Sequence, residues 1–354
     1  MAVQLHNVTA AGGRKYVFHP QQIESLLSGD GHSVISATIA PTNSCNLHCS
    51  YCNQKNRLQD ISLPLTTIKE FIDTLLSRGL EGVVISGGGE PTRYKQFNEL
   101  VRWLKNDKDL ALGLITNGTN NRCGNEIVDT WDEFDWIRIS LNFVKNKLLN
   151  IKVPNKKDGK IGFSFIYTDQ SKEILEQVAK LAEVYRAKFV RVMPDVNKSN
   201  METNQAIEKL REIIRHFDNK DMFAIQRKPQ TPAKTSECHV AKIKTFLCAD
   251  GSLAPCDCFP SLTDASGNKI GGILPEKFNL NKSGIKDYLD FLDGKRTLDF
   301  NPKEDCDTCS YAANNSLLDQ LFTLRAKYPQ ASVTELFDMM GMKATDDIID
   351  VKFV

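Results

Sequence analysis

Three closely spaced cysteines near the start of the chain have a pattern that suits metal chemistry. Cys45, Cys49 and Cys52 lie in the segment NSCNLHCSYC with the spacing C-x3-C-x2-C. Thiolates hold iron–sulfur clusters, and a cluster of four irons needs four ligands, so three cysteines leave one iron with an open position that can bind a substrate. The alternative is a structural zinc site, which needs a fourth protein ligand; His48 directly adjoins Cys49, and such neighbours rarely converge on one metal.

A glycine-rich turn and a second set of cysteines add to this chemistry. Gly87, Gly88, Gly89 and Glu90 stand in SGGGEPTRY, where glycines let the backbone approach a ligand and leave carbonyls and a carboxylate to accept bonds from an ammonium. The chain has ten cysteines, and clustered thiols are better read as metal ligands than as disulfides in a cytoplasmic protein. Beyond the first three, they are Cys238, Cys248, Cys256 and Cys258, the pair Cys306 and Cys309, and the isolated Cys123.

A repeated β-α pattern positions the first of these motifs. The expected strands cover residues 34–40, 83–86, 112–116, 136–141, 162–167 and 189–193, with helical patterns between them. This alternation is typical of a parallel sheet, and loops at the carboxyl ends of parallel strands face an active-site mouth. The cysteine triplet follows the first expected strand and the glycine turn follows the second. Between them we predict a helix that begins with a capping box of Thr67 and Glu70. The apolar stripes expected on this and the later helices are Ile68, Phe71, Ile72, Leu75 and Leu76; Phe97, Leu100, Val101 and Leu104; Ile174, Val178, Leu181 and Tyr185; and Ile207, Leu210, Ile214 and Phe217.

The cysteine spacing, Tyr51 before the third cysteine, and the Gly88-Gly89-Glu90 turn resemble the radical S-adenosylmethionine (SAM) superfamily. The resemblance extends through the six-strand half and implies an α/β fold: a partial (β/α)6 TIM-like barrel with a small C-terminal cysteine-rich α+β cluster-binding extension. The division that follows is an N-terminal extension (1–33), the partial barrel (34–227), a cluster domain (228–312) and C-terminal helices (313–354).

The resemblance also assigns roles to individual residues. The turn from Gly87 to Glu90 is expected to receive the methionyl amino group of SAM, and Tyr51 belongs to the signature loop. Groups for the ribose and the carboxylate are expected at Asn117, Ser140, Asn142 and Arg191. The alternative for each of these polar residues is a solvated strand end or a helix cap, and for Arg191 a surface charge. In the implied mechanism, the reduced cluster passes an electron to SAM, and the resulting 5′-deoxyadenosyl radical abstracts hydrogen from a C–H bond.

The later cysteines resemble a SPASM extension in its shorter, single-cluster "twitch" form, because no cysteine follows Cys309. A hairpin-like turn is expected at Asp250 and Gly251, leading to Cys256. We expect Cys238, Cys256, Cys306 and Cys309 to hold an auxiliary [4Fe–4S] cluster; a zinc site of four cysteines is the alternative. Cys248 and Cys258 are then spare, although either could replace a ligand. A spare thiol can return a hydrogen atom to a substrate radical and so epimerise it, whereas the plainer interpretation is a buried cysteine without a catalytic role.

Charge and length narrow the partners that we expect. With 45 Lys and Arg against 44 Asp and Glu, the formal charge of +1 provides no broad basic field for nucleic acid or anionic membrane. The sequence contains no uninterrupted stretch of about 18 apolar residues, and nothing in it suggests a membrane span or a signal peptide. We therefore expect a cytoplasmic protein. A flavodoxin- or ferredoxin-type donor would supply electrons.

Three functions remain open from the sequence. The first is dehydrogenation or epimerisation of a small molecule such as a sugar or aminocyclitol, which the short region before the first strand favours. The second is maturation of a peptide or protein. The third is a non-catalytic iron–sulfur or zinc protein for electron transfer, in which Gly88, Gly89 and Glu90 would have no use.

Overall fold

Contacts within the chain define two compact units. The structure, a computed structural model, describes residues 12–52, 54, 57–58, 60–144, 147–155, 159–195, 198–226, 235–257, 285–297, 301–306, 309–345, 348 and 350–354. The first unit, here the cysteine-loop unit, includes Thr42–Asp60 and Ile85–Lys228. The second, here the tail unit, comprises His6–Pro41, Ile61–Val84 and Pro229–Val354. This division by contacts differs from the boundaries expected along the sequence at residues 33, 227 and 312, which stay a prediction.

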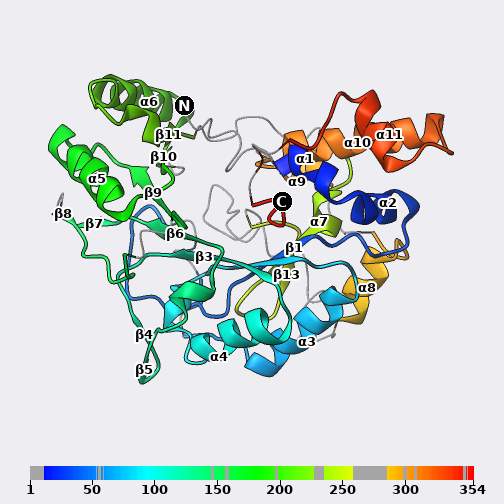
Figure 1. Ribbon diagram of the computed structural model, residues 1–354, viewed down its shortest axis with the longest axis horizontal. Helices are drawn as coiled ribbons and strands as arrows, with labels where there is room; N and C mark the ends of the chain where they lie inside the picture. The colour runs from blue at the N-terminus through cyan, green and yellow to red at the C-terminus, as the bar shows by residue number, and fades with distance from the viewer. Residues whose placement is uncertain are drawn as a thin grey trace. The chain divides into compact units, whose positions relative to one another are not determined.

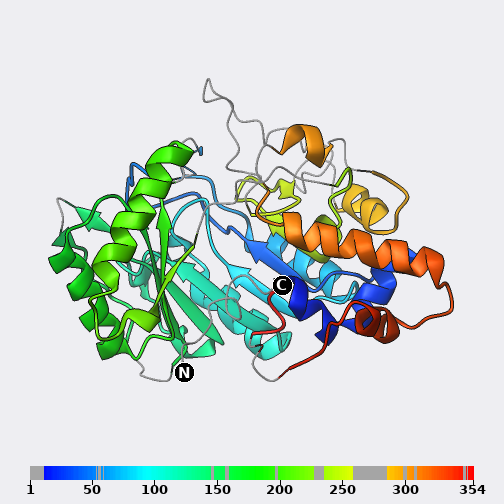
Figure 2. The ribbon, with the colours of Figure 1, turned by 90° about the horizontal axis from the view of Figure 1, so that it is seen from above.

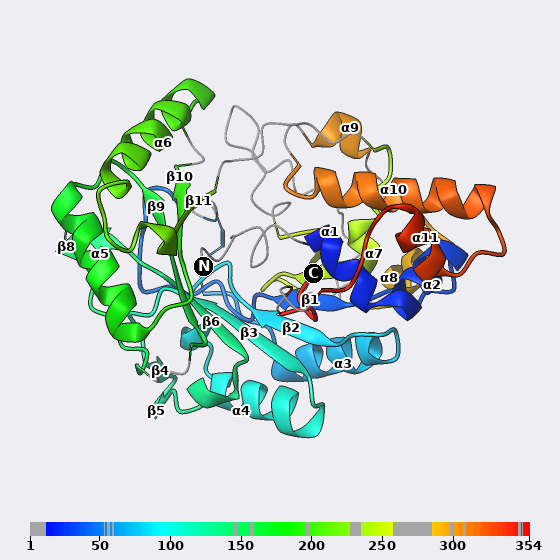
Figure 3. The ribbon, with the colours of Figure 1, turned by 45° about the horizontal axis from the view of Figure 1, so that its top comes forward.

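The cysteine-loop unit is built on parallel strands in the order β11-β10-β9-β6-β3. Strand β9 is buried along nearly its whole length, as expected for a parallel strand covered on both faces. Helices α5 and α6 lie along the same side of β9 and β10 (Figure 1; Figure 3). The strands are β3 (Ala111–Thr116), β6 (Trp136–Ser140), β9 (Ile161–Tyr167), β10 (Val190–Pro194) and β11 (Phe223–Ile225), and the helices are α5 (Lys172–Tyr185) and α6 (Asn200–Ile214).

Two consecutive connections in this unit contain hairpins; the sequence indicated a general β-α alternation here, but no particular helix was predicted in either connection. The hairpin of β4 (Arg122–Cys123) and β5 (Glu126–Ile127) lies between β3 and β6, together with the short η5 (Trp131–Glu133). The hairpin of β7 (Phe143–Val144) and β8 (Lys147–Leu148) lies between β6 and β9. Gly118 and Gly124 adopt positive φ, which favours turns over helix. The expected strict alternation is therefore wrong between residues 117 and 160.

Shorter elements complete this unit on either side of the central strands. Helix α4 (Phe97–Arg102) continues into the π-turn η4 (Trp103–Asp107), and buries the predicted stripe of Phe97, Leu100, Val101 and Leu104. The 3-10 turns η3 (Pro91–Arg93) and η6 (Lys220–Met222) precede α4 and β11.

The tail unit carries strands in the order β2-β1-β12-β13. Strand β12 (Lys244–Leu247), from the cysteine-rich segment, pairs in parallel with β1 (Ser36–Ile39), and β13 (Leu253–Ala254) returns antiparallel to β12. With β2 (Gly82–Ile85), all six predicted strands form, and the expected α/β fold class is confirmed. Seven strands in the described residues lie outside the six predicted ones: β4, β5, β7, β8, β11, β12 and β13.

The helix between β1 and β2 begins earlier than predicted. Helix α3 spans Leu65–Leu76, and its N-cap is Pro64, which makes no side-chain cap bond. The expected capping box of Thr67 and Glu70 is wrong, because Thr67 lies inside the helix. The apolar stripe is correct, since Ile68, Phe71, Ile72 and Leu75 are all fully buried.

The tail unit has further helices, several of which pack on a separate apolar cluster. Tyr16, Ile23, Leu318, Leu336 and Val354 are among its members, so the first and last described segments share one core. Helix α11 lies beside the C-terminal end of the long α10 (Figure 2). No helix in the described part of the chain is long and apolar enough to cross a membrane. These elements are α1 (Gly12–Lys15), η2 (Tyr16–Phe18), α2 (Pro20–Ser28), α7 (Val240–Ile243), α8 (Lys286–Leu292), α9 (Pro302–Asp305), α10 (Ala312–Lys327) and α11 (Val333–Met339).

Lys15 donates hydrogen bonds to the last described segment of the chain, and its buried amine should make the free energy of unfolding rise at alkaline pH. Its Nζ donates to the carbonyls of Asp350 and Phe353 at 3.1 and 2.8 Å, and burial lowers its pKa to about 8. The folded chain thus releases this proton near pH 8, whereas the unfolded chain keeps it until about pH 10.5. Stability should rise between these values, by about 3 kcal/mol from this group. Urea unfolding from pH 7.5 to 10.5 measures this rise in the free energy of unfolding. An equal rise in Lys15→Met would contradict the assignment of the rise to Lys15.

Candidate active site

The three cysteines of the first group share one loop after β1, in the cysteine-loop unit. Cys45, Cys49 and Cys52 are half-buried free thiols, and a turn brings the amide of Cys52 to within 3.1 Å of the carbonyl oxygen of Cys49. Burial raises the pKa of Cys45 and of Cys49, and the neighbouring thiols contribute to both increases. The three thiols thus lie half-buried in one loop, as the spacing of the motif indicates.

The glycine turn after β2 packs directly against this loop. The amides of Gly89 and Glu90 donate to the carbonyls of Thr42 and Ser44 at 3.0 and 2.8 Å. A Cβ atom on Gly88 would lie 2.0 Å from Asn43 Oδ1, and one on Gly89 would lie 2.2 Å from the Ser44 carbonyl oxygen. A side chain on Gly89 would push the two loops apart, so glycine is a packing requirement there, whereas at Gly88 the Asn43 side chain would have to move. The close approach seen here is to the cysteine loop, and the approach of this backbone to a ligand stays a prediction.

Glu90 lies at the centre of the hydrogen bonds that join the loops. It is 2% exposed, and its Oε1 accepts from Thr92 Oγ1 at 2.8 Å and from Thr116 Oγ1 at 2.6 Å. Its Oε2 accepts from the amide of Asn117 at 2.7 Å. A carboxylate has about four acceptor sites, so Oε2 retains capacity for a further donor such as an ammonium. Burial raises the pKa of Glu90, and these hydrogen bonds oppose that increase.

Asn117 connects the end of β3 to the cysteine loop. Its Nδ2 donates to Asn46 Oδ1 at 2.9 Å, and its Oδ1 accepts from the hydroxyl of Thr119 at 2.8 Å. Asn46 Nδ2 in turn donates to the same hydroxyl at 2.9 Å. Asn46 and Thr119 were not singled out from the sequence; only their polar types at strand ends could have indicated this ring.

Asn142 links the end of β6 to two residues of the cysteine loop. Its Oδ1 accepts from Tyr51 Oη at 2.8 Å and from Cys49 Sγ at 3.2 Å, while its Nδ2 donates to the carbonyl of Ser140 at 2.6 Å. Burial raises the pKa of Tyr51, which keeps its hydroxyl a donor. Ser140 Oγ lies 3.5 Å from Ser164 Oγ. The structure thus brings Tyr51, Asn142 and Cys49 together, and the expected roles of Ser140 and Asn142 toward SAM stay predictions.

Arg191 occupies β10 of the same unit and is half-buried. Its Nη2 lies 3.0 Å from Met193 Sδ. A half-buried strand position differs from the solvated surface charge that was the plainer alternative. Its role toward the SAM carboxylate stays a prediction.

These residues fit the iron–sulfur group that the thiols imply. The three thiols converge on one loop, and glycines without room for Cβ atoms border it. Within the described ranges, no three His, Cys, Asp or Glu side chains are placed to hold a single metal ion. The sequence did not single out Arg57, a buried cation in the same loop whose Nη1 lies 3.7 Å from Cys52 Sγ. Its only sequence signal is a positive charge close behind the third cysteine.

The second cysteine group lies in the tail unit, where helix α10 draws its segments together. Asn315, 1% exposed, accepts from the amide of Val240 at 3.0 Å and places Nδ2 3.8 Å from Cys238 Sγ. Burial raises the pKa of Cys238 to about 11, and Cys309 adds to this increase. The hydroxyl of Tyr311 donates to Asp257, the neighbour of Cys256, at 2.8 Å. Three of the four predicted ligand segments are therefore tied to one another.

The hairpin predicted in this group is confirmed. Gly251 has a φ of +83°, and Ser252 donates to Asp250 Oδ1 through its amide and its hydroxyl. The amide of Cys248 bonds to the carbonyl of Ser252 at 2.8 Å, so Cys248 stands at the hairpin end. Cys306 and Cys309 follow helix α9 and precede α10. Cys258, the other proposed hydrogen donor, lies outside the described residues.

Asn315 gives a direct test of this arrangement. We expect Asn315→Ala to lower the free energy of unfolding by about 1–3 kcal/mol, because it leaves the buried amide of Val240 without its acceptor. Gln320→Ala, on the exposed side of the same helix, is the matched control and should change it by less than about 0.5 kcal/mol. Thermal and urea unfolding of the metal-free protein measure both. Equal effects of the two substitutions would contradict the assigned role.

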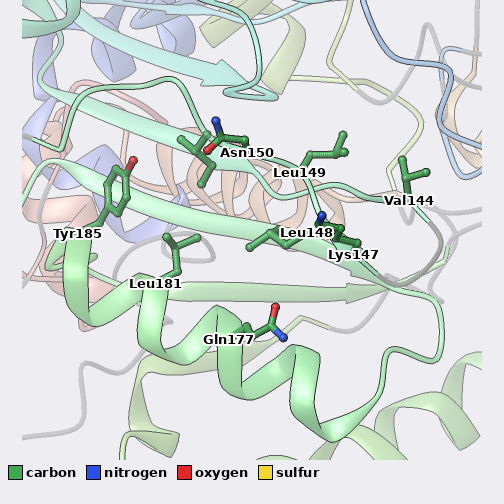
Figure 4. Close-up of a pocket in the computed structure, with 9 residues that line it drawn as sticks. Val144, Lys147, Leu148, Leu149, Asn150, Gln177, Leu181 and Tyr185 are labelled. Carbon is green, nitrogen blue, oxygen red and sulfur yellow. The ribbon is translucent and has the colours of Figure 1, made fainter.

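A separate cavity of about 670 Å³ lies in the cysteine-loop unit, and its lining contains no thiol. It is bounded by the β7–β8 hairpin and helix α5, with Leu148, Leu149, Leu181 and Tyr185 among its walls (Figure 4). No cysteine and none of the predicted SAM-site residues lines it. It is therefore not the site built around the cysteine loop.

The residues of the first site lie in a segment that is similar to a known protein family. The sequence profile described as the radical SAM superfamily matches residues 39–203, which include the cysteine triplet, the glycine turn, Asn117, Asn142 and Arg191. The GTP 3′,8-cyclase of Synechocystis sp. is 33% identical over 98 residues, which are 27% of this chain. The chain spans about 30% of the length of that curated relative.

The chain is also similar to solved structures. SuiB of Streptococcus suis bound to the precursor peptide SuiA has 17% identity and a TM-score of 0.48, with 71% of this chain and 64% of that one covered. The structure of anSMEcpe with bound AdoMet has 15% identity and a TM-score of 0.49, with 90% and 97% covered.

Proposed function

We propose, from the match of residues 39–203 to the radical SAM superfamily profile, that this chain is an enzyme that binds a [4Fe–4S] cluster through Cys45, Cys49 and Cys52 and cleaves SAM reductively. When bound, the cluster supplies the electron that breaks the C–S bond of SAM and releases a 5′-deoxyadenosyl radical. The observation that carries this proposal is the packing of the glycine turn against the cysteine loop, with no room for a Cβ atom on Gly89.

The residues around the thiols supply binding and orientation. The backbone of Gly87 to Gly89 and the remaining acceptor capacity of Glu90 Oε2 suit an ammonium, which is the amino end of SAM. Asn142 fixes the loop that carries Cys49 through the hydrogen bond that it accepts from Tyr51. The bond from the Cys49 thiol is lost when that sulfur binds iron as a thiolate. We assign Asn117, Ser140 and Arg191 to the ribose and carboxylate of SAM, as their positions on β3, β6 and β10 allow. Fixed donors in a water-poor site cost no reorganisation when the bond breaks.

For the substrate, we propose a small molecule with an unactivated C–H bond that is dehydrogenated or epimerised. Dehydrogenation needs an acceptor for the second electron, and an auxiliary [4Fe–4S] cluster on Cys238, Cys256, Cys306 and Cys309 would provide it. The contacts of Asn315 with Cys238 and of Tyr311 with Asp257 support this ligand set, because they tie its segments together. Epimerisation instead needs a thiol donor, for which Cys248 and Cys258 are the candidates. A flavodoxin- or ferredoxin-type protein would deliver the first electron.

Anaerobic assays of the reconstituted and reduced protein test the proposal. The expected result is conversion of SAM to 5′-deoxyadenosine; its absence would favour the non-catalytic electron-transfer alternative. Product mass then separates the substrate classes. Loss of two hydrogens indicates dehydrogenation, one solvent deuterium at carbon indicates epimerisation, and a crosslinked peptide would replace the small-molecule proposal with that of a peptide maturase.

A further inference from the structure

Arg57 is a buried cation inside the cysteine loop, and its bonds fix the position of its charge. The residue is 8% exposed. Its Nε donates to the carbonyl of Asn43 at 2.9 Å, and its Nη1 donates to the carbonyl of Gln54 at 2.8 Å. The same Nη1 lies 3.7 Å from Cys52 Sγ, within hydrogen-bond range of a sulfur. The guanidinium thus spans the loop from its first residues to its third cysteine.

A cation in this position changes the energy of adding an electron. Reduction adds one negative charge to a thiolate-ligated cluster, and a fixed positive charge nearby stabilises the reduced form. Hydrogen bonds to ligand sulfurs act in the same direction. Screening by salt is weak for a buried group, so the effect is not lost at physiological ionic strength.

On the basis of the function proposed above, we propose that Arg57 raises the reduction potential of the cluster held by Cys45, Cys49 and Cys52 through its charge and its bond to Cys52. Arg57 is a positioning residue, since it acts through the cluster ligands and not on the substrate. Its two carbonyl bonds hold the charge in place, which a flexible cation at the surface would not achieve.

Redox titration followed by EPR tests this inference on the full-length reconstituted protein. The signal to follow is the one that changes when SAM is added, which separates the SAM-binding cluster from any other. Arg57→Gln and Arg57→Met remove the charge, and Arg57→Lys keeps it. Arg93→Gln is the matched control, because Arg93 is an exposed cation that donates to Ser44 Oγ, one residue before Cys45. Iron content is measured for each variant.

The neutral variants should shift the reduction equilibrium at least tenfold toward the oxidised form, which is about 59 mV more negative for one electron. Arg57→Lys and Arg93→Gln should shift it by less than half of that. The result from one neutral variant is enough for the test, provided that this variant retains a cluster whose EPR signal responds to SAM. An unchanged potential, an equal shift in Arg57→Lys, or loss of the cluster from both neutral variants would overturn the inference, the last by making Arg57 a structural requirement. A wild-type protein without a SAM-responsive signal would instead refute the proposed function.

Discussion

Replacing Cys45, Cys49 and Cys52 together by alanine should remove about four of about eight iron atoms per chain and abolish SAM cleavage. The expected loss is complete because these thiols are the proposed ligands of the iron that binds SAM. Iron and sulfide analysis after anaerobic reconstitution gives the count, and chromatography of 5′-deoxyadenosine gives the activity. Cys123→Ala is the control, since Cys123 is buried in β4 and lies outside both ligand sets.

Two other iron counts would change the interpretation. A fall from about four irons to none would mean that the C-terminal cysteines hold zinc or no metal, and the dehydrogenase proposal would lose its electron acceptor. An unchanged count in the triple variant would contradict the assignment of the cysteine loop itself. A normal count in Cys123→Ala is needed for either conclusion.

Glu90→Ala should lower the free energy of unfolding by about 3 kcal/mol and remove SAM binding. The substitution leaves the buried hydroxyl of Thr116 and the amide of Asn117 without their acceptor, and each unsatisfied buried group costs about 1–3 kcal/mol. It also frees the glycine turn, whose position depends on the bonds between Glu90 and β3. Urea unfolding and equilibrium dialysis with labelled SAM measure the two effects.

The control and an intermediate variant sharpen this prediction. Glu99→Ala removes an exposed carboxylate from α4 in the same unit and should change stability by less than about 0.5 kcal/mol. Glu90→Gln keeps the size of the side chain but replaces one acceptor by a donor, so its effect should fall between the two. If Glu90→Ala unfolded like Glu99→Ala, the central role of Glu90 would be refuted.

The sequence predicted the features that depend on local pattern. All six strands form where β-rich runs occur, and α3, α5 and α6 bury the expected stripes, because apolar periodicity is set by the geometry of each element alone. The cysteine loop and the glycine turn follow β1 and β2 as predicted, since a spacing motif is local by nature. The Asp250–Gly251 hairpin is a further case, because only glycine adopts its positive φ without strain.

Tertiary structure decided what depends on partners distant in the chain. Strand β12 is a short run in a cysteine-rich segment, and only its parallel pairing with β1 makes it a strand. The capping box at Thr67 and Glu70 failed because packing of Leu65 extended the helix to Pro64. The roles of Arg57, Asn46 and Asn315 likewise arise from contacts with carbonyls, amides and thiols that no spacing along the chain encodes. The sequence alone determined which thiols and glycines could do chemistry, whereas the fold decided which buried polar groups hold them in place, because such groups must find partners wherever the backbone brings them.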